Sequence, residues 1–175
     1  TLSLEHLNQG LVDFVILPQD LGQAAKIGNQ LITHELYRDE LVCLLRSNHP
    51  LLQTANLNWD QDTYLACRHI HVRDNELGAP IFDQTLAERG LHRNIAVQVP
   101  DFHSASALCS NSDLVFTTST NWADYICNKL ELTCLPMPCA TLPVVYSLIW
   151  HQRSESDPAH LWFKDKLIKA GEARQ

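Results

Sequence analysis

The chain has 175 residues, 45% of them hydrophobic and 19% charged, and its formal net charge at pH 7 is −7. That size and composition suit a globular core, arranged as one domain or as two small lobes. The negative charge argues against nucleic-acid binding by this chain itself, because phosphate contacts need clustered lysines and arginines. No apolar run approaches the ~18 residues of a membrane span, so we expect no membrane partner.

The first part of the chain predicts a short helix followed by two strand regions. Gly10 caps the helix, and a polar segment with two glycines separates the strand regions. In chain order, the predictions are a helix at 4–9, a strand at 11–17, a loop at 18–30, a strand region at 31–45, a turn at 48–50 and a helical turn at 58–62.

From Tyr64 onward the pattern of strands and helices starts again. This second series predicts strands at 64–72, 95–99, 113–117 and 132–135, with helices at 80–90, 104–111 and 121–130. Strands that alternate with helices predict parallel sheets with right-handed crossovers. The restart near residue 62 and the return near residue 135 predict a middle lobe inserted in an outer lobe.

The chain closes with a predicted strand and a predicted helix. Val144–Trp150 is largely apolar on both faces, which indicates a strand buried in an α/β layer. Asp157 and Pro158 indicate a helix start, because the carboxylate can accept an otherwise unpaired N–H and proline lacks one. The apolar residues that follow at helical spacing are Ala159, Trp162, Phe163, Leu167 and Ala170. We therefore expect a helix folded back over a buried strand.

Three stretches occur in an order and spacing typical of one family. They read LNQGLVDFVI at 7–16, ELYRDELVCLL at 35–45 with HPL at 49–51, and IWHQR at 149–153 with DPAHLWFKDKL at 157–167. Together they resemble the effector-binding domain of LysR-type transcriptional regulators, over nearly the whole chain. The resemblance implies an α/β fold of two lobes, similar to periplasmic binding proteins, with parallel or mixed sheets and two hinge strands that cross between the lobes.

The resemblance also implies a division of the chain. Residues 1–62 and 136–175 would form a partial lobe I, and residues 63–135 would form lobe II. The family's lobe I begins with a strand and a helix before a second strand, and this chain begins near the end of that second strand. We therefore expect an exposed sheet edge in lobe I, which another segment can fill. The winged helix-turn-helix head of the family is expected to lie outside this chain.

Motifs of catalysis and phosphate binding are absent from the sequence, and we expect neither an enzyme nor a cofactor. Cys109 and His103 could be a nucleophile and a base, but a core cysteine and a surface histidine fit their spacing better. His69 and His71, with His103, could suit a metal, although polar strand residues that face a cleft or solvent are the favoured interpretation. The six cysteines form no CxxC pair, which favours reduced thiols in the cytoplasm.

A ligand site is predicted at the carboxyl ends of the strands, where small molecules bind in open α/β sheets. Ser104 heads a predicted helix, so its N–H and hydroxyl could hold a carboxylate, and Arg68 could add a fixed charge. For each residue alone a cap, a turn or a surface role is an equal alternative, and only their convergence favours a site. The predicted set is Pro18 and Gln19 from one lobe and Arg68, Phe102, His103, Ser104, Thr117 and Thr118 from the other.

The resemblance implies the inducer-sensing and dimerising part of a bacterial transcriptional regulator. A small effector, an organic acid or an aromatic compound, is expected to bind between the lobes. Binding would change how the DNA-binding heads of an oligomer sit on promoter DNA, so DNA is a partner only through the absent head. Two alternatives stay open: a solute-binding protein of a transporter, and an enzyme on a similar two-lobe fold.

Overall fold

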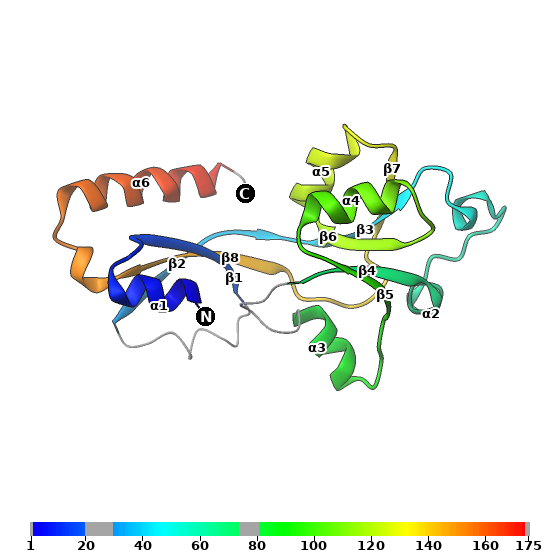
Figure 1. The fold of residues 1–175 in the computed structure, drawn as a ribbon, viewed down its shortest axis with the longest axis horizontal. Coiled ribbons are helices and arrows are strands. Elements are labelled where there is room, and N and C mark those ends of the chain that lie inside the picture. Colours follow the sequence, from blue (N-terminus) through cyan, green and yellow to red (C-terminus); the bar gives the residue numbers. More distant parts are fainter. Residues whose placement is uncertain (1, 20–29, 74–80, 174–175) are drawn as a thin grey trace. The chain divides into compact units, whose positions relative to one another are not determined.

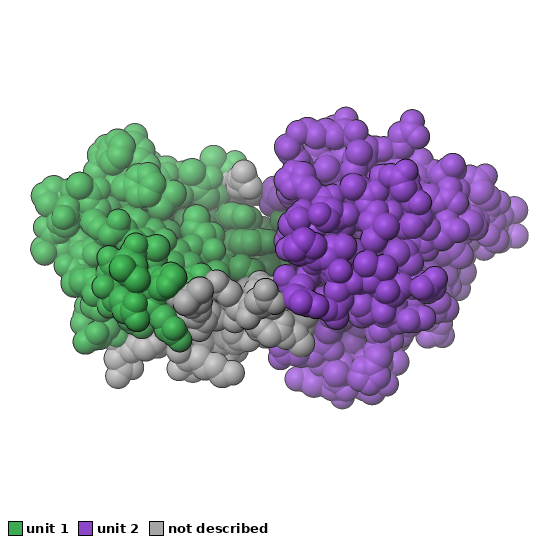
Figure 2. All heavy atoms as spheres, viewed as in Figure 1, with its two compact units in different colours: residues 1–39, 143–175 green, residues 40–142 purple. Residues whose placement is uncertain are grey.

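The computed structural model describes residues 2–19, 30–73 and 81–173, which belong to two compact units. Unit 1 consists of residues 1–39 and 143–175, and unit 2 consists of residues 40–142 (Figure 2). Within the described residues, unit 1 has a three-stranded sheet and unit 2 has a five-stranded sheet (Figure 1). The prediction of a mixed α/β fold is therefore confirmed.

Unit 1 is built on β8 (Val144–His151), the central strand of its sheet. β1 (Phe14–Gln19) pairs with one side of β8 and β2 (Leu31–Asp39) pairs with the other. Ser147, Leu148 and Ile149 are buried, which confirms the buried closing strand. Both pairings are antiparallel instead of parallel, because β8 arrives from unit 2 and enters between β1 and β2 in the opposite direction.

Two helices cover the two faces of this sheet, α1 (Leu2–Gln9) on one and α6 (Pro158–Glu172) on the other (Figure 1). Asp157 caps α6, since its Oδ1 accepts from the N–H of Ala159 at 2.8 Å, and this helix start was predicted correctly. Leu167 and Ile168 pack against the buried side chains of the sheet. Trp162 is 64% exposed, so the prediction that it lies on the buried side of the helix is wrong.

Unit 2 has the strand order β5-β4-β6-β3-β7. β4 is parallel to its neighbours β5 and β6, whereas β3 is antiparallel to its neighbours β6 and β7. The bounds of these strands are Leu41–Arg46 for β3, Arg68–Val72 for β4, Asn94–Val99 for β5, Val115–Ser119 for β6 and Leu132–Pro136 for β7. Parallel pairing, which the alternation of strands and helices predicted, therefore holds for the β5-β4-β6 part of this sheet.

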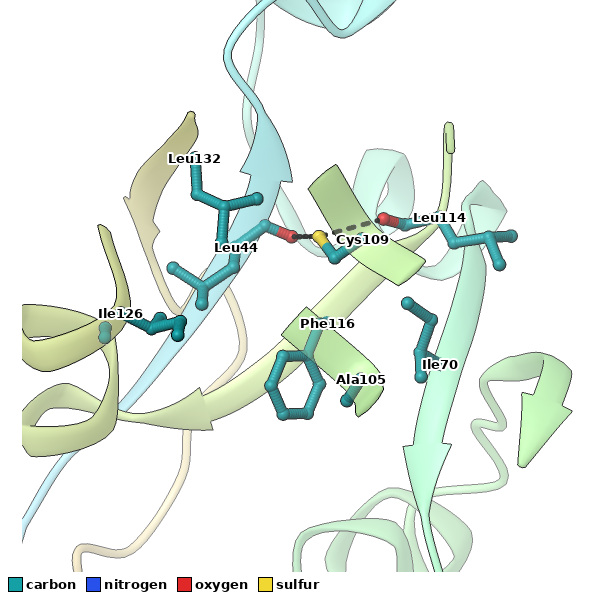
Figure 3. Packing of buried hydrophobic residues seen from close by; sticks show 9 residues of the cluster. Leu44, Ile70, Ala105, Cys109, Leu114, Phe116, Ile126 and Leu132 are labelled. Atoms are coloured by element: carbon teal, nitrogen blue, oxygen red, sulfur yellow. Dashed lines mark hydrogen bonds between the residues drawn. The ribbon is translucent and has the colours of Figure 1, made fainter. Parts of the chain in front are cut away.

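Side chains on both faces of the unit 2 sheet are buried against helices. α4 (Phe102–Ser110) and α5 (Thr120–Cys127) cover one face, where Leu44, Ile70 and Phe116 form a cluster (Figure 3). α2 (Gln61–Ala66) and α3 (Ile81–Glu88) cover the other face, on which the core includes Cys43 and Val115. Short 3₁₀ helices span Pro50–Gln53 in this unit and Gln152–Ser154 in unit 1.

The boundaries of the two units differ from the predicted lobes. β3 pairs with both β6 and β7, so residues 40–62 fold with unit 2 and not with an outer lobe. Residues 136–142 also belong to unit 2, and the chain passes between units at 39–40 and 142–143 instead of near residues 63 and 135. The first crossing between the units was not predicted, because the apolar pattern of residues 31–45 continues from β2 into β3 and is interrupted only by Asp39 and Glu40.

Two local predictions were also wrong. The predicted strand at 64–72 is a helix followed by a shorter strand, because Asp60 accepts a hydrogen bond from the Thr63 N–H at 2.9 Å and starts α2. Pro18 lies within β1 and not in a loop, as proline is tolerated on an edge strand. Residues 20–29 of the predicted loop at 18–30, and Pro80 at the predicted start of the helix at 80–90, lie outside the described residues.

Candidate functional site

α4 follows β5 at the carboxyl end of that strand, as predicted, but it begins at Phe102, two residues before the predicted start at Ser104. Its N-cap residue is Asp101, whose carboxylate accepts from the Ser104 N–H at 2.8 Å and from the Ser104 hydroxyl at 2.9 Å. The backbone bond from Ser104 and then its hydroxyl bond lower the pKa of the Asp101 carboxyl. The two groups that Ser104 was expected to offer to a ligand are therefore already engaged by Asp101. An aspartate three residues before a serine at a helix start was the sequence signal for this cap.

Phe102 and His103 are the first two residues of α4, and both are exposed. The Phe102 ring lies 5.9 Å from the Phe116 ring and 5.6 Å from the Trp122 ring, measured between centroids. The His103 ring meets Trp122 edge-on at 4.7 Å. The first turn of α4 thus carries an exposed aromatic surface that continues onto α5.

Thr117 and Thr118 lie in β6 and, as neighbours in a strand, point to opposite faces of the sheet. Thr117 Oγ1 lies 2.7 Å from the Tyr64 hydroxyl, on the side of α2. Thr118 is 2% exposed, and its hydroxyl has no hydrogen-bond partner among the described residues. Thr118 shares a face with Phe116, whose ring contacts Phe102, so this hydroxyl lies on the α4 side near the end of the strand.

Arg68 lies at the other end of the sheet, which corrects the predicted set. It is the first residue of β4 and pairs with Asn94, the first residue of β5, whereas α4 follows the last residue of β5. Four residue steps along a strand separate Arg68 from the strand ends, which corresponds to roughly 13 Å. The structure therefore does not bring the Arg68 guanidinium to the start of α4.

Arg73 follows the last residue of β4, at the carboxyl end of this strand, and was absent from the predicted set. Its N–H donates to the Val99 carbonyl at 2.8 Å, and its guanidinium donates to Gln98 Oε1 at 3.2 Å. The signal was its position directly after a predicted strand, at the end where ligands bind in α/β sheets.

Pro18 and Gln19 belong to unit 1. They are the last residues of β1 and lie opposite Tyr146 and Val145, close to the point where the chain enters this unit. The Tyr146 ring stacks on Tyr37 from β2 with 4.8 Å between centroids. The end of the unit 1 sheet therefore carries a row formed by a proline and two tyrosines, and the side chain of Gln19 lies outside the described part of the structure.

Of the three histidines considered as metal ligands, His69 and His71 face α2 and α3, whereas His103 lies on α4. His69 is fully buried and its Nε2 lies 2.9 Å from the Tyr64 carbonyl oxygen, while His71 Nδ1 lies 3.9 Å from Asp83 Oδ2. Burial, with the Arg93 charge, lowers the pKa of His69 to about 4. Within the described ranges, no group of three or more His, Cys, Asp and Glu side chains could hold a metal ion.

Cys109 is part of the core of unit 2 and is not paired with His103. Its thiol donates to the carbonyl oxygens of Leu44 at 3.2 Å and Leu114 at 3.4 Å, as Figure 3 shows. Burial raises the pKa of this thiol to about 12, so it stays protonated and unreactive at neutral pH. Among the described helices, none has the length and apolar character needed to cross a membrane.

The chain forms two α/β units and crosses between them twice. Polar and aromatic groups lie at the carboxyl ends of the parallel strands in unit 2. These features are typical of a class of domains that bind small molecules. The chain belongs to the LysR substrate binding domain family, whose match covers residues 1–172. This match confirms the resemblance seen in the sequence. It also confirms that the chain is not an enzyme, because the family consists of regulator domains.

Relatives of known name are transcriptional regulators. The chain is 30% identical to the HTH-type transcriptional regulator SyrM of Rhizobium meliloti (strain 1021) over 166 residues, which cover 94% of this chain and 48% of SyrM. The chain spans about half the length of the curated relatives it matches.

Solved structures show the same fold. The probable transcriptional regulator PA0477 from Pseudomonas aeruginosa is similar with a TM-score of 0.81 and 28% identity, over 93% of this chain and 52% of that chain. The effector binding domain of QuiR, solved in complex with shikimate, is similar with a TM-score of 0.74 and 18% identity, over 98% of this chain and 77% of that chain. At that identity the likeness to QuiR shows the fold alone.

Proposed function

We propose that this chain is the ligand-sensing part of a LysR-type transcriptional regulator, and that a small organic effector binds at one end of the unit 2 sheet. The proposed contacts are Phe102, His103 and Thr118 on the α4 side of the sheet, whereas Ser104 and Thr117 of the predicted set are already bonded to Asp101 and Tyr64. The observation that carries the proposal is the buried Thr118 hydroxyl, which has no hydrogen-bond partner among the described residues. An unpaired buried hydroxyl costs about 1–3 kcal/mol, so a ligand group that reaches it would stabilise the complex.

Pro18 and Gln19 remain a prediction for unit 1. They lie at the carboxyl end of β1, and ligands of α/β domains bind at the carboxyl ends of strands. Arg68 is removed from the proposed site, because it lies at the amino end of β4.

For the longer protein we propose the role that the relatives' names suggest. Effector binding to this domain would change how a DNA-binding head outside this chain contacts promoter DNA, in an oligomer assembled by the whole protein. The net charge of −7 supports assigning the DNA contact to another part of the protein. This role would place the protein in the cytoplasm, together with the promoter.

The test is a ligand screen by two-dimensional NMR on the ¹⁵N-labelled chain, with aromatic compounds and small organic acids. A binder is expected to shift the amide signals of 101–104 and 117–119. Phe102→Ala should weaken its binding about tenfold, which corresponds to about 1.4 kcal/mol. Arg68→Ala is the matched control and should leave the affinity unchanged. Binders that shift only signals elsewhere, or a Phe102→Ala variant that binds them with unchanged affinity, would refute the site.

A further inference from the structure

The negative charge of Asp101 occupies the position at which a helix N-terminus would hold an anion. The first turn of α4 offers N–H groups and the positive end of a helix dipole, which together favour a carboxylate ligand. In this chain Asp101 takes the Ser104 N–H at 2.8 Å and the Ser104 hydroxyl at 2.9 Å. A carboxylate has about four acceptor positions, so Asp101 can still accept from a further hydrogen-bond donor.

Among the described residues, no lysine or arginine forms an ion pair with Asp101, and His103 is the neighbour whose charge would favour its carboxylate. The guanidinium of Arg73 is bonded to Gln98 on β5, and Arg68 lies at the far end of β4. A ligand carboxylate placed at the start of α4 would meet the Asp101 carboxylate, and two negative charges in contact repel each other. A ligand hydroxyl or amine would instead donate to Asp101.

Two neighbouring side chains indicate the rest of the ligand. Phe102 follows Asp101 directly and exposes 42% of its surface, which offers a ring face or edge to an aromatic ligand. The Thr118 hydroxyl is buried and lacks a partner among the described residues, on the same side of β6 as the Phe102 contact. This hydroxyl points independently to a polar ligand group at this position.

We infer that Asp101 determines the chemical class of the effector: an aromatic molecule that presents hydroxyl or amine donors to Asp101, and not a carboxylate. The inference rests on the proposed function of this site. The sequence predicted an organic acid or an aromatic compound as the effector. Asp101, which was absent from the predicted set, favours the aromatic compound.

The experiment compares two probes that share a ring and a phenol but differ in charge, 4-hydroxybenzyl alcohol and 4-hydroxybenzoate. Their dissociation constants are measured by NMR titration of the whole chain, from the amide shifts of 101–104. The alcohol is expected to bind about tenfold more tightly than the benzoate. In Asp101→Ser the difference should disappear, because serine keeps the helix cap but carries no charge.

Asp157→Ser is the matched control, since Asp157 caps α6 in the other unit in the same way. It should lose a similar amount of stability and keep the preference for the alcohol. If the wild-type chain binds the benzoate as tightly as the alcohol, with shifts at 101–104, the inference is wrong while the proposed site stands. If neither probe shifts those amides at millimolar concentration, the result counts against the site and the inference together.

Discussion

His69 is a buried histidine that makes the stability of unit 2 depend on pH. Burial, with the nearby Arg93 charge, lowers its pKa to about 4, whereas the unfolded chain has the ordinary value of about 6.5. The unfolded state therefore binds a proton first as the pH falls. The free energy of unfolding therefore keeps its full value above pH 6.5. Between pH 6.5 and pH 4 it falls progressively, by at most about 3 kcal/mol from this histidine.

His69→Gln should flatten this dependence, because an amide donor can still bond to the Tyr64 carbonyl but does not titrate. Urea unfolding of both proteins from pH 7.5 to pH 4.5, followed through unit 2 signals, measures the effect. The prediction fails if the two stability curves stay parallel over this range.

The ion pair between Asp83 and Arg93 is the second residue-scale feature with an energetic consequence. Arg93 donates two hydrogen bonds of 2.7 Å to the Asp83 carboxylate, and the Arg93 side chain is only 5% exposed. Removing one partner of a buried pair leaves the other charge unpaired in a poorly solvated position. Asp83→Asn is therefore expected to destabilise the protein by about 3 kcal/mol in urea unfolding.

The control is Asp113→Asn, which removes the partner of Arg46 at a site where the Asp113 side chain is 58% exposed. Exposed pairs contribute about 0–1 kcal/mol, so this variant should unfold nearly as the parent does. If the two variants lose the same amount of stability, burial does not strengthen the pair between Asp83 and Arg93.

At the scale of elements, Gly171 allows α6 to approach β2 closely. A Cβ atom at this position would lie 3.0 Å from the Leu36 carbonyl oxygen and 3.2 Å from the Leu36 Cα, both of which are backbone atoms. Gly→Ala within a helix normally stabilises by about 1 kcal/mol, but here the helix must shift to accommodate the methyl group. Gly171→Ala is expected to destabilise unit 1 by about 1–2 kcal/mol in thermal or urea unfolding.

The neighbouring variant Glu172→Ala changes an exposed residue and should stay within about 0.5 kcal/mol of the parent. A stabilised Gly171→Ala protein would show that the gap between α6 and β2 adapts without cost.

The elements most accessible from the sequence were those with their own start and stop signals. Asp157 with Pro158 identified the start of α6, and Gly90, with a φ of 72°, ends the helical region of α3 as expected. The helix at 61–66 was missed because its residues resemble a strand, and only the Asp60 cap distinguishes them. The boundary between units was missed because sheet membership depends on long-range pairing, which an apolar pattern does not specify.

The candidate site was predicted only in part, because its residues also depend on where the strands begin and end. The segment around Phe102 and the end of β6 could be identified, because each follows or ends a recognisable strand. The end of a strand at which a residue lies depends on the bounds of that strand. Because α2 was not predicted, β4 was expected to begin at residue 64, and Arg68 was not recognised as its first residue. Which partner each polar group takes, as Asp101 takes Ser104, was settled only by the folded geometry.

At the scale of the whole molecule, the free edge of β1 predicts association between copies. Among the described strands, β1 and β2 form the two edges of the unit 1 sheet, but β2 carries the exposed Glu35 and Arg38, whereas β1 has no charged residue. Ile16 on β1 is 47% exposed. Uncharged apolar edges present unpaired N–H and C=O groups and recruit further strands, and charged side chains oppose this pairing.

We therefore expect the isolated chain to self-associate as its concentration rises, and Ile16→Lys to reduce that association. Thr33→Lys on the edge strand β2 is the control, since that edge is already charged, and it should change little. Light scattering over a concentration series measures the association. Hydrogen exchange locates it, because amides of β1 that point away from β8 should become protected only in the associated state. A chain that stays monomeric at all concentrations, with uniformly protected β1 amides, would show that this edge recruits no second copy.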